Sequence, residues 1–115
     1  MIRIVKADNN IKEKLQLTHD AFCVFNGDDL SGFCEYALTP PTAQIISIKC
    51  KDNMLKDGLV RQTFNFALDN GCPTAVFDDK VRNELTALGI LRNDCENSFN
   101  ILEFFAKLNG VEIFY

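Results

Sequence analysis

The feature that most constrains the fold is a change of hydrophobic period between Gln44 and Phe77. The run QIISIKC reads as a strand, and the segment from Met54 to Asn70 then places apolar residues at the spacing of a helix that lies on a sheet. Asn-Gly at the end of this segment is a left-handed helix stop, and the apolar run TAVF follows as a short buried strand. Two strands joined through a long helix are expected to be parallel neighbours with a right-handed crossover.

The residues before this crossover predict an antiparallel meander. In AFCVFNGDDLSGFCEYALTPPTAQIISIKC, β-branched and aromatic runs are interrupted at NGDD and at TPPT, which are turn sequences. This pattern predicts three antiparallel strands. A strand IRIVKA and a short helix NNIKEKLQLTHD come before them.

Three further elements are expected after TAVF: a helix at DDKVRNELTALG, a helix at NSFNILEFFAKLNG and a closing strand at VEIFY. No repeat, linker or low-complexity tract divides the chain. The predicted fold is therefore a single α/β domain (an α+β mixed sheet), spanning residues 1–115, with helices on both faces of the sheet.

Composition excludes several classes of protein. Apolar residues make up 47% of the chain, which is enough for a core, and the net charge is −4. An acidic chain without a basic cluster is a poor partner for nucleic acid. No apolar run has the length of a signal peptide or a membrane span, so we expect no membrane association and a cytoplasmic location.

The cysteines argue against a metal centre. The chain has five, an odd number, and none forms a C-x-x-C pair, so neither a zinc site nor a secreted disulfide framework is expected. Cys23 and Cys34 stand symmetrically about NGDD, which suggests that they face each other across a hairpin. Buried packing and a redox role are the two alternatives for this pair.

The element order and several segments resemble the GNAT-type N-acetyltransferases over roughly residues 21–91. The segments are the meander, the lysine-bearing stretch CKDNMLKDG, the helix GLVRQTFNFALDNG, the strand after it and ELTALGI. The stretch from Asp57 to Ala67 also resembles the helix DGLLRAALNYA of small GNAT-like proteins. The resemblance implies a GNAT-like acyl-CoA N-acyltransferase fold, with acetyl-CoA or coenzyme A as cofactor.

In that family a glycine-rich loop and a helix N-terminus hold the coenzyme A diphosphate, and the preceding strand splays from its parallel neighbour to bind the pantetheine arm. Transferred to this chain, the loop corresponds to residues 51–58. The cofactor-binding residues that the resemblance implies are Ile48, Cys50, Lys51, Lys56, Asp57, Gly58 and Leu59.

The chain departs from the family pattern at three positions. Gly58 is the single glycine of the loop, Gln44 stands near the position of a common catalytic glutamate, and Leu85 stands at the position of a tyrosine acid. Lys49, Lys51 and Lys56 either take part in phosphate binding or are solvated. Asp57 either caps a helix that begins at Gly58 or repels a phosphate.

Glu35 is the candidate for a catalytic base. Glu35 and Tyr36 are adjacent on a strand and must point to opposite faces, so one of them could line an acceptor cleft. His19 is the single histidine and is either a base or a capping residue.

Two functions stay open. The chain is either an N-acetyltransferase that moves an acyl group from acetyl-CoA to a small amine, or a catalytically inactive GNAT-fold module for ligand binding or interaction. Phe99, Phe104 and Phe105 form either core or the surface of a homodimer.

Overall fold

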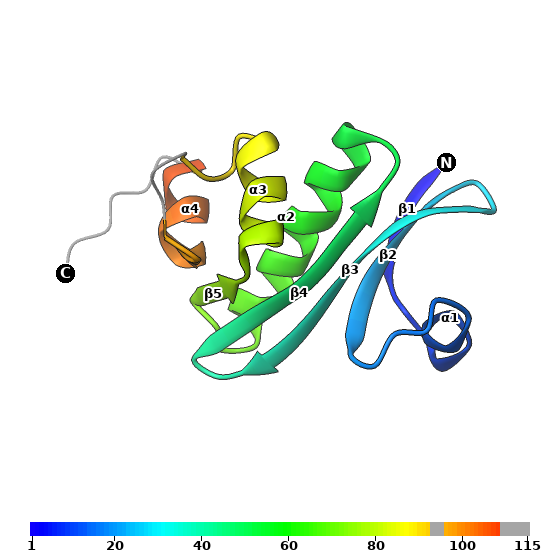
Figure 1. The fold of residues 1–115 in the computed structure, drawn as a ribbon, viewed down its shortest axis with the longest axis horizontal. Coiled ribbons are helices and arrows are strands. Elements are labelled where there is room, and N and C mark those ends of the chain that lie inside the picture. Colours follow the sequence, from blue (N-terminus) through cyan, green and yellow to red (C-terminus); the bar gives the residue numbers. More distant parts are fainter. Residues whose placement is uncertain (93–95, 109–115) are drawn as a thin grey trace.

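A single mixed sheet organises the computed structural model, which describes residues 1–92 and 96–108 (Figure 1). The strands lie in the order β1-β2-β3-β4-β5-β6. In chain order the elements are β1 (Ile2–Lys6), α1 (Asn9–Lys14), β2 (Asp20–Asn26), β3 (Asp29–Thr39), β4 (Thr42–Cys50), α2 (Asn53–Asp69), β5 (Thr74–Phe77), α3 (Asp79–Ala87), β6 (Ser98–Asn100) and α4 (Ile101–Leu108).

The pairing of the strands confirms the meander and the crossover. β2, β3 and β4 are antiparallel, and β1 adds a fourth antiparallel strand beside β2. β5 follows α2 and pairs with β4 in parallel, as the strand–helix–strand pattern predicts. The mixed α/β sheet expected from the sequence is therefore present.

One element was predicted wrongly. The segment that begins at Asn97 was expected to be helical throughout, but Ser98–Asn100 is a strand antiparallel to β5. The side-chain oxygen of Asn100 accepts a hydrogen bond from the backbone N–H of Glu103 at 2.9 Å, which is the geometry of a helix cap. The helix α4 therefore begins at Ile101, and the expected closing strand VEIFY lies outside the described residues.

The two faces of the sheet are covered unequally. Figure 1 shows α2 lying along the sheet behind β3 and β4, with α1 beside β2 and α4 at the opposite end near β5. The main core lies between the sheet and α2, where Leu59, Val60 and Phe64 are fully buried. The cluster under α1 is smaller, and its buried members are Ala7, Ala21 and Cys23.

The register of the first hairpin corrects the expectation for Cys23 and Cys34. Asn26 pairs with Asp29, and a β-bulge then shifts the pairing, so that Cys34 lies opposite Phe22. Cys23 belongs to the cluster under α1, whereas Cys34 lies in the main core. Adjacent positions along a strand point to opposite faces, so the two thiols do not face each other.

A second bulge in β4 opens the sheet. Glu35 pairs with Ser47 and Tyr36 pairs with Ile45, which leaves Ile46 as the extra residue. The parallel pairing of β4 with β5 ends at Ile45, directly before the bulge. Because a bulge bends its strand, the second half of β4 separates from β5. In the described part of the chain no strand pairs with this half of β4 on the β5 side.

Candidate functional site

A cavity of about 420 Å³ lies where β4 separates from β5. This volume is within the usual range for small-molecule sites. β3 and β4 form one wall of the cavity and the first turns of α3 form another. The residues that line it are Leu17, Phe33, Glu35, Ile46, Ser47, Ile48, Lys49, Asp78, Lys80, Val81 and Glu84.

Glu35 is the buried acidic group of this cavity. It is 7% exposed, and Oε1 accepts a hydrogen bond from the Ser47 hydroxyl at 3.1 Å. Oε2 accepts a hydrogen bond from the backbone N–H of His19 at 3.2 Å. Each carboxylate oxygen has a second lone pair, so Glu35 is held in place and can still accept another proton donor.

The structure places His19 beside Glu35, which the sequence did not indicate. Its Nδ1 lies 3.5 Å from Oε2 of Glu35 and 3.1 Å from the hydroxyl oxygen of Thr18. The His19 side chain is about half exposed, whereas that of Glu35 is almost fully buried. The two candidate bases of the sequence therefore lie together, with the histidine on the solvent side of the carboxylate.

The N-terminus of α2 is occupied by a side chain of the protein itself. Oδ1 of Asp52 accepts hydrogen bonds from the backbone N–H groups of Met54 and Leu55, at 2.7 and 3.2 Å. The helix therefore begins at Asn53 with Asp52 as its cap, and the expectation that Asp57 caps a helix at Gly58 was wrong. Only two residues separate β4 from α2, so most of the expected loop 51–58 is the first turn and a half of the helix.

The charged residues of this first part of α2 are also paired. Nζ of Lys56 lies 2.7 Å from Oε2 of Glu84, which joins α2 to α3, and the Lys56 side chain is 13% exposed. Nε of Arg61 donates to Oδ2 of Asp57 at 2.8 Å, one helical turn away. Lys56 and Asp57 therefore have partners within the protein.

The other residues that the resemblance implied as cofactor-binding are spread over the region. Ile48 lines the cavity, Cys50 is half-buried at the end of β4, and Lys51 is exposed after it. Gly58 faces β1, since a Cβ added to it would lie 3.6 Å from Cδ1 of Ile4. Leu59 is fully buried in the main core.

Some residues of the cavity carried no signal in the sequence. Ser47 reaches Glu35 only because of the bulge at Ile46, since the simple register of the hairpin places Ile46 opposite Glu35. Asp78 and Lys80 join the cavity because α3 begins immediately after β5. A helix start after a strand was readable from the sequence, but its position beside β4 was not.

Tyr36 lies on the opposite face, in the main core. Its ring stacks on Phe22 with centroids 5.6 Å apart, and its hydroxyl is buried without a hydrogen-bond partner among the described residues. Burial, with smaller contributions from the charges of Asp20 and Cys34, raises the pKa of Tyr36 to about 12. Tyr36 is therefore a packing residue and not a proton donor for the cavity.

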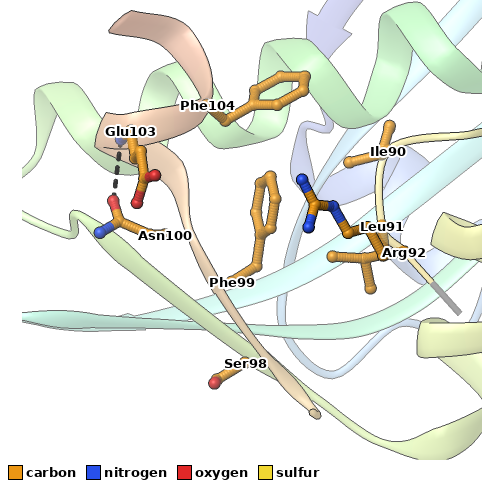
Figure 2. Close-up of a pocket in the computed structure, with 8 residues that line it drawn as sticks. All are labelled: Ile90, Leu91, Arg92, Ser98, Phe99, Asn100, Glu103 and Phe104. Atoms are coloured by element: carbon orange, nitrogen blue, oxygen red, sulfur yellow. Dashed lines mark hydrogen bonds between the residues drawn. The ribbon is translucent and has the colours of Figure 1, made fainter. Parts of the chain in front are cut away.

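A second cavity, of about 430 Å³, lies at the other end of the molecule (Figure 2). Figure 2 shows Phe99 and Phe104 on one side of it, with Ile90, Leu91 and Arg92 on the other. The ring of Phe99 also packs against Phe64 of α2, at 5.3 Å between centroids. This cavity is bordered by core aromatics and lies apart from Glu35 and from the point where β4 leaves β5.

Metal-binding clusters and membrane-spanning helices are both absent from the described residues. Within residues 1–92 and 96–108, no group of three or more histidine, cysteine or acidic residues is placed to hold a metal ion. No helix in the same ranges is long and apolar enough to cross a membrane.

Comparison with solved structures identifies the fold. An acetyltransferase of the GNAT family from Staphylococcus aureus superposes with a TM-score of 0.59 at 9% identity, over 86% of this chain and 92% of that chain. An acetyltransferase from Bacillus subtilis in complex with CoA superposes with a TM-score of 0.47 at 17% identity, over 77% of this chain and 76% of that chain. No family model matches the chain, and no curated protein matches it. The superposition on the Staphylococcus aureus structure shows that the chain has a GNAT fold.

Proposed function

We propose that the protein is an acyl-CoA-dependent N-acyltransferase whose active site is the cavity between β3, β4 and the start of α3. The observation that carries the proposal is the position of Glu35, a buried carboxylate at the point where two parallel strands separate. The GNAT fold supports the same function, because the acetyltransferase from Staphylococcus aureus shares this arrangement of elements. The acceptor that we propose is a small amine.

The open half of β4 suits the pantetheine arm of coenzyme A. From Ser47 to Cys50 the strand pairs with β3 on one side, and on the other side its backbone groups face the cavity region without a strand partner among the described residues. Pantetheine contains two amide groups, which can pair with such a free strand edge as an added strand would. When bound, an acyl thioester supplies the acyl carbon for the new amide bond and the sulfur that departs as the C–S bond breaks.

Glu35 performs the proton transfer. The carboxylate accepts the proton that the amine nitrogen loses as it attacks the acyl carbon. Ser47 and the backbone N–H of His19 hold the carboxylate in one orientation, which limits the reorganisation that the step requires. Leu85, at the position of the family's tyrosine, is fully buried in the core and carries no acidic group. The departing thiolate is therefore protonated from solvent, and Glu35 releases its proton to solvent, which regenerates the carboxylate.

The test is an acyl-transfer assay. The protein is incubated with acetyl-CoA and a panel of small amines, and the released thiol and the acetylated amine are measured. Glu35→Gln should lower the rate by about 10²- to 10⁴-fold, the usual contribution of a general base. Glu13→Gln is the matched control, because Glu13 is exposed on α1, and its rate should equal that of the wild type.

The alternative is a GNAT-fold module that binds a ligand without catalysis. The charged pairs at the start of α2 favour it, because Asp52 and Glu84 occupy groups that could otherwise meet a phosphate. Under this alternative coenzyme A or pantetheine raises the melting temperature, but no amine in the panel is acetylated. If no ligand raises the melting temperature and no amine is acetylated, the proposed function is wrong.

The homodimer and the cytoplasmic location stay predictions. Phe104 and Phe105 pack against the main core, and Arg61 lies over the ring of Phe104 at 5.0 Å. Leu102 on the same helix is 43% exposed, so a dimer surface would have to use this outer side of α4.

A further inference from the structure

The partial positive charge at the N-terminus of α2 is already balanced by the carboxylate of Asp52. This pairing affects which part of a coenzyme A thioester the protein can recognise. A helix N-terminus attracts anions because its first N–H groups have no partner within the helix. In α2 the Asp52 carboxylate accepts from two of these groups, those of Met54 and Leu55. The anion that binds this helix end is thus the carboxylate of a residue of the protein itself.

Lys56, a mostly buried cation in the first part of α2, also has an ion-pair partner. Lys56 forms its 2.7 Å pair with Glu84, and Asp57 pairs with Arg61. A diphosphate that approached α2 would meet the Asp52 carboxylate at the N–H groups and would compete with Glu84 for Lys56. Like charges placed this close repel, and breaking a partly buried ion pair costs free energy.

The cavity at the strand separation is not closed by the Asp52 carboxylate, because Asp52 is not among the residues that line it. Its wall contains the second half of β4 and the carboxylate of Glu35, and Glu84, the partner of Lys56, borders it from α3. The cavity therefore offers the pantetheine arm and the thioester an open strand edge, whereas two N–H groups at the start of α2 already bind the Asp52 carboxylate.

We infer that the protein recognises its acyl donor through the acyl-pantetheine arm, and that the nucleotide diphosphate contributes little to binding. The inference rests on the proposed function and narrows its substrate class to acyl thioesters of pantetheine, with or without an attached nucleotide. The cavity selects the arm, and the Asp52 carboxylate disfavours phosphate at α2.

The first test compares ligands by calorimetry on the wild-type protein. Coenzyme A and reduced pantetheine should bind with dissociation constants within about five-fold of each other. 3′-Phosphoadenosine 5′-diphosphate, the part of coenzyme A that carries the diphosphate, should show no binding at millimolar concentration. Charge-assisted hydrogen bonds to a seated diphosphate would instead favour coenzyme A by about 100-fold or more, and that result would overturn the inference.

The second test removes the charge of Asp52 and keeps a side chain that can cap α2. Asn is as good a helix cap as Asp, so Asp52→Asn should leave the fold intact. Its affinity for coenzyme A should rise about three-fold or more, while its affinity for pantetheine should not change. Asp8→Asn is the matched control, because Asp8 caps α1 in the same way through a 2.8 Å bond from the Ile11 N–H, and both affinities should stay at the wild-type value.

The outcomes separate this inference from the proposed function. A coenzyme A affinity that is unchanged or lower in Asp52→Asn would show that the carboxylate does not exclude phosphate, and would overturn the inference while leaving the acyltransferase intact. Failure of both coenzyme A and pantetheine to bind would refute the two together. Equal binding of both ligands without acyl transfer would support the inference and refute the catalytic proposal.

Discussion

The two faces of the sheet differ in what they bury. The face under α2 is closed and apolar, and it places even the hydroxyl of Tyr36 in the core without a hydrogen-bond partner in residues 1–92 and 96–108. The other face has a small cluster under α1, and beyond that cluster it places Glu35 in a cavity with two hydrogen-bond partners. The comparison teaches that neighbouring residues of one strand serve separate purposes: Tyr36 stabilises the fold and Glu35 is available for chemistry.

The largest difference in the free energy of unfolding should come from removing one phenylalanine ring on each face of the sheet. Phe64 is fully buried between α2 and the sheet, so Phe64→Ala should lower the free energy of unfolding by about 3–5 kcal/mol. Phe33 is half-buried beside the cavity, and Phe33→Ala should cost only about 1–2 kcal/mol. Urea denaturation measures both values. Equal losses would mean that the two faces contribute equally to stability.

Two glycines provide the next test. A Cβ on Gly32 would lie 2.7 Å from Cα of Cys50, against the backbone of the open half of β4, so Gly32→Ala should destabilise by about 3 kcal/mol. Gly58 lies inside α2 with space for a methyl group, and Gly58→Ala should stabilise by about 0.5–1 kcal/mol. Thermal and urea denaturation show whether each substitution raises or lowers the stability of the protein. If Gly58→Ala instead weakens coenzyme A binding, Gly58 approaches the ligand.

Alkaline pH should destabilise both faces of the sheet through their buried thiols. Burial raises the pKa of the Cys34 thiol from 9.0 to about 12 and that of Cys23 to about 11. A raised pKa keeps the thiol protonated in the folded state, so its contribution to stability is complete below about pH 9 and is lost as the pH rises through the folded-state value. Urea denaturation in reducing buffer at about pH 8 and about pH 11 should show a smaller loss of stability for Cys34→Ala and for Cys23→Ala than for the wild type. A loss as large as that of the wild type in either variant would contradict the raised pKa of that thiol.

The smallest effect concerns the buried hydroxyl. Because the Tyr36 hydroxyl has no partner among the described residues, Tyr36→Phe removes an unsatisfied polar group and should change the free energy of unfolding by less than about 1 kcal/mol, in the stabilising direction. Acyl transfer should be unaffected, because the ring lies on the face away from the cavity. A loss of stability of about 2 kcal/mol or more would show that the hydroxyl has a hydrogen-bond partner.

Much of the fold could be predicted because its elements have strong local signals. The helix stop at Gly71, which has a φ of +83°, and the turns at NGDD and TPPT divide the chain at the observed places. The strand Ser98–Asn100 was missed because three residues carry too little periodicity to distinguish a strand from the start of a helix.

The candidate site was less predictable. Glu35 could be chosen as a candidate because alternation along a strand puts it on the opposite face from Tyr36. Its contacts with Ser47 and His19 depend on a bulge and on the loop before β2, and neither has a sequence signature in this chain. The role of Asp52 was missed because several polar residues precede the helix and any of them could have been its cap.

The sequence by itself determined the order of strands and helices from β1 to α3, the parallel crossover around α2 and the presence of an apolar core, because these follow from the period of hydrophobic residues and from local turn chemistry. The tertiary structure decided which side chains share the cavity, where β4 leaves β5, and that the start of α2 is closed by Asp52. The physical reason is that register shifts and caps depend on how distant segments pack. A one-residue bulge changes the partners of every later residue in its strand and leaves the local pattern almost unaltered.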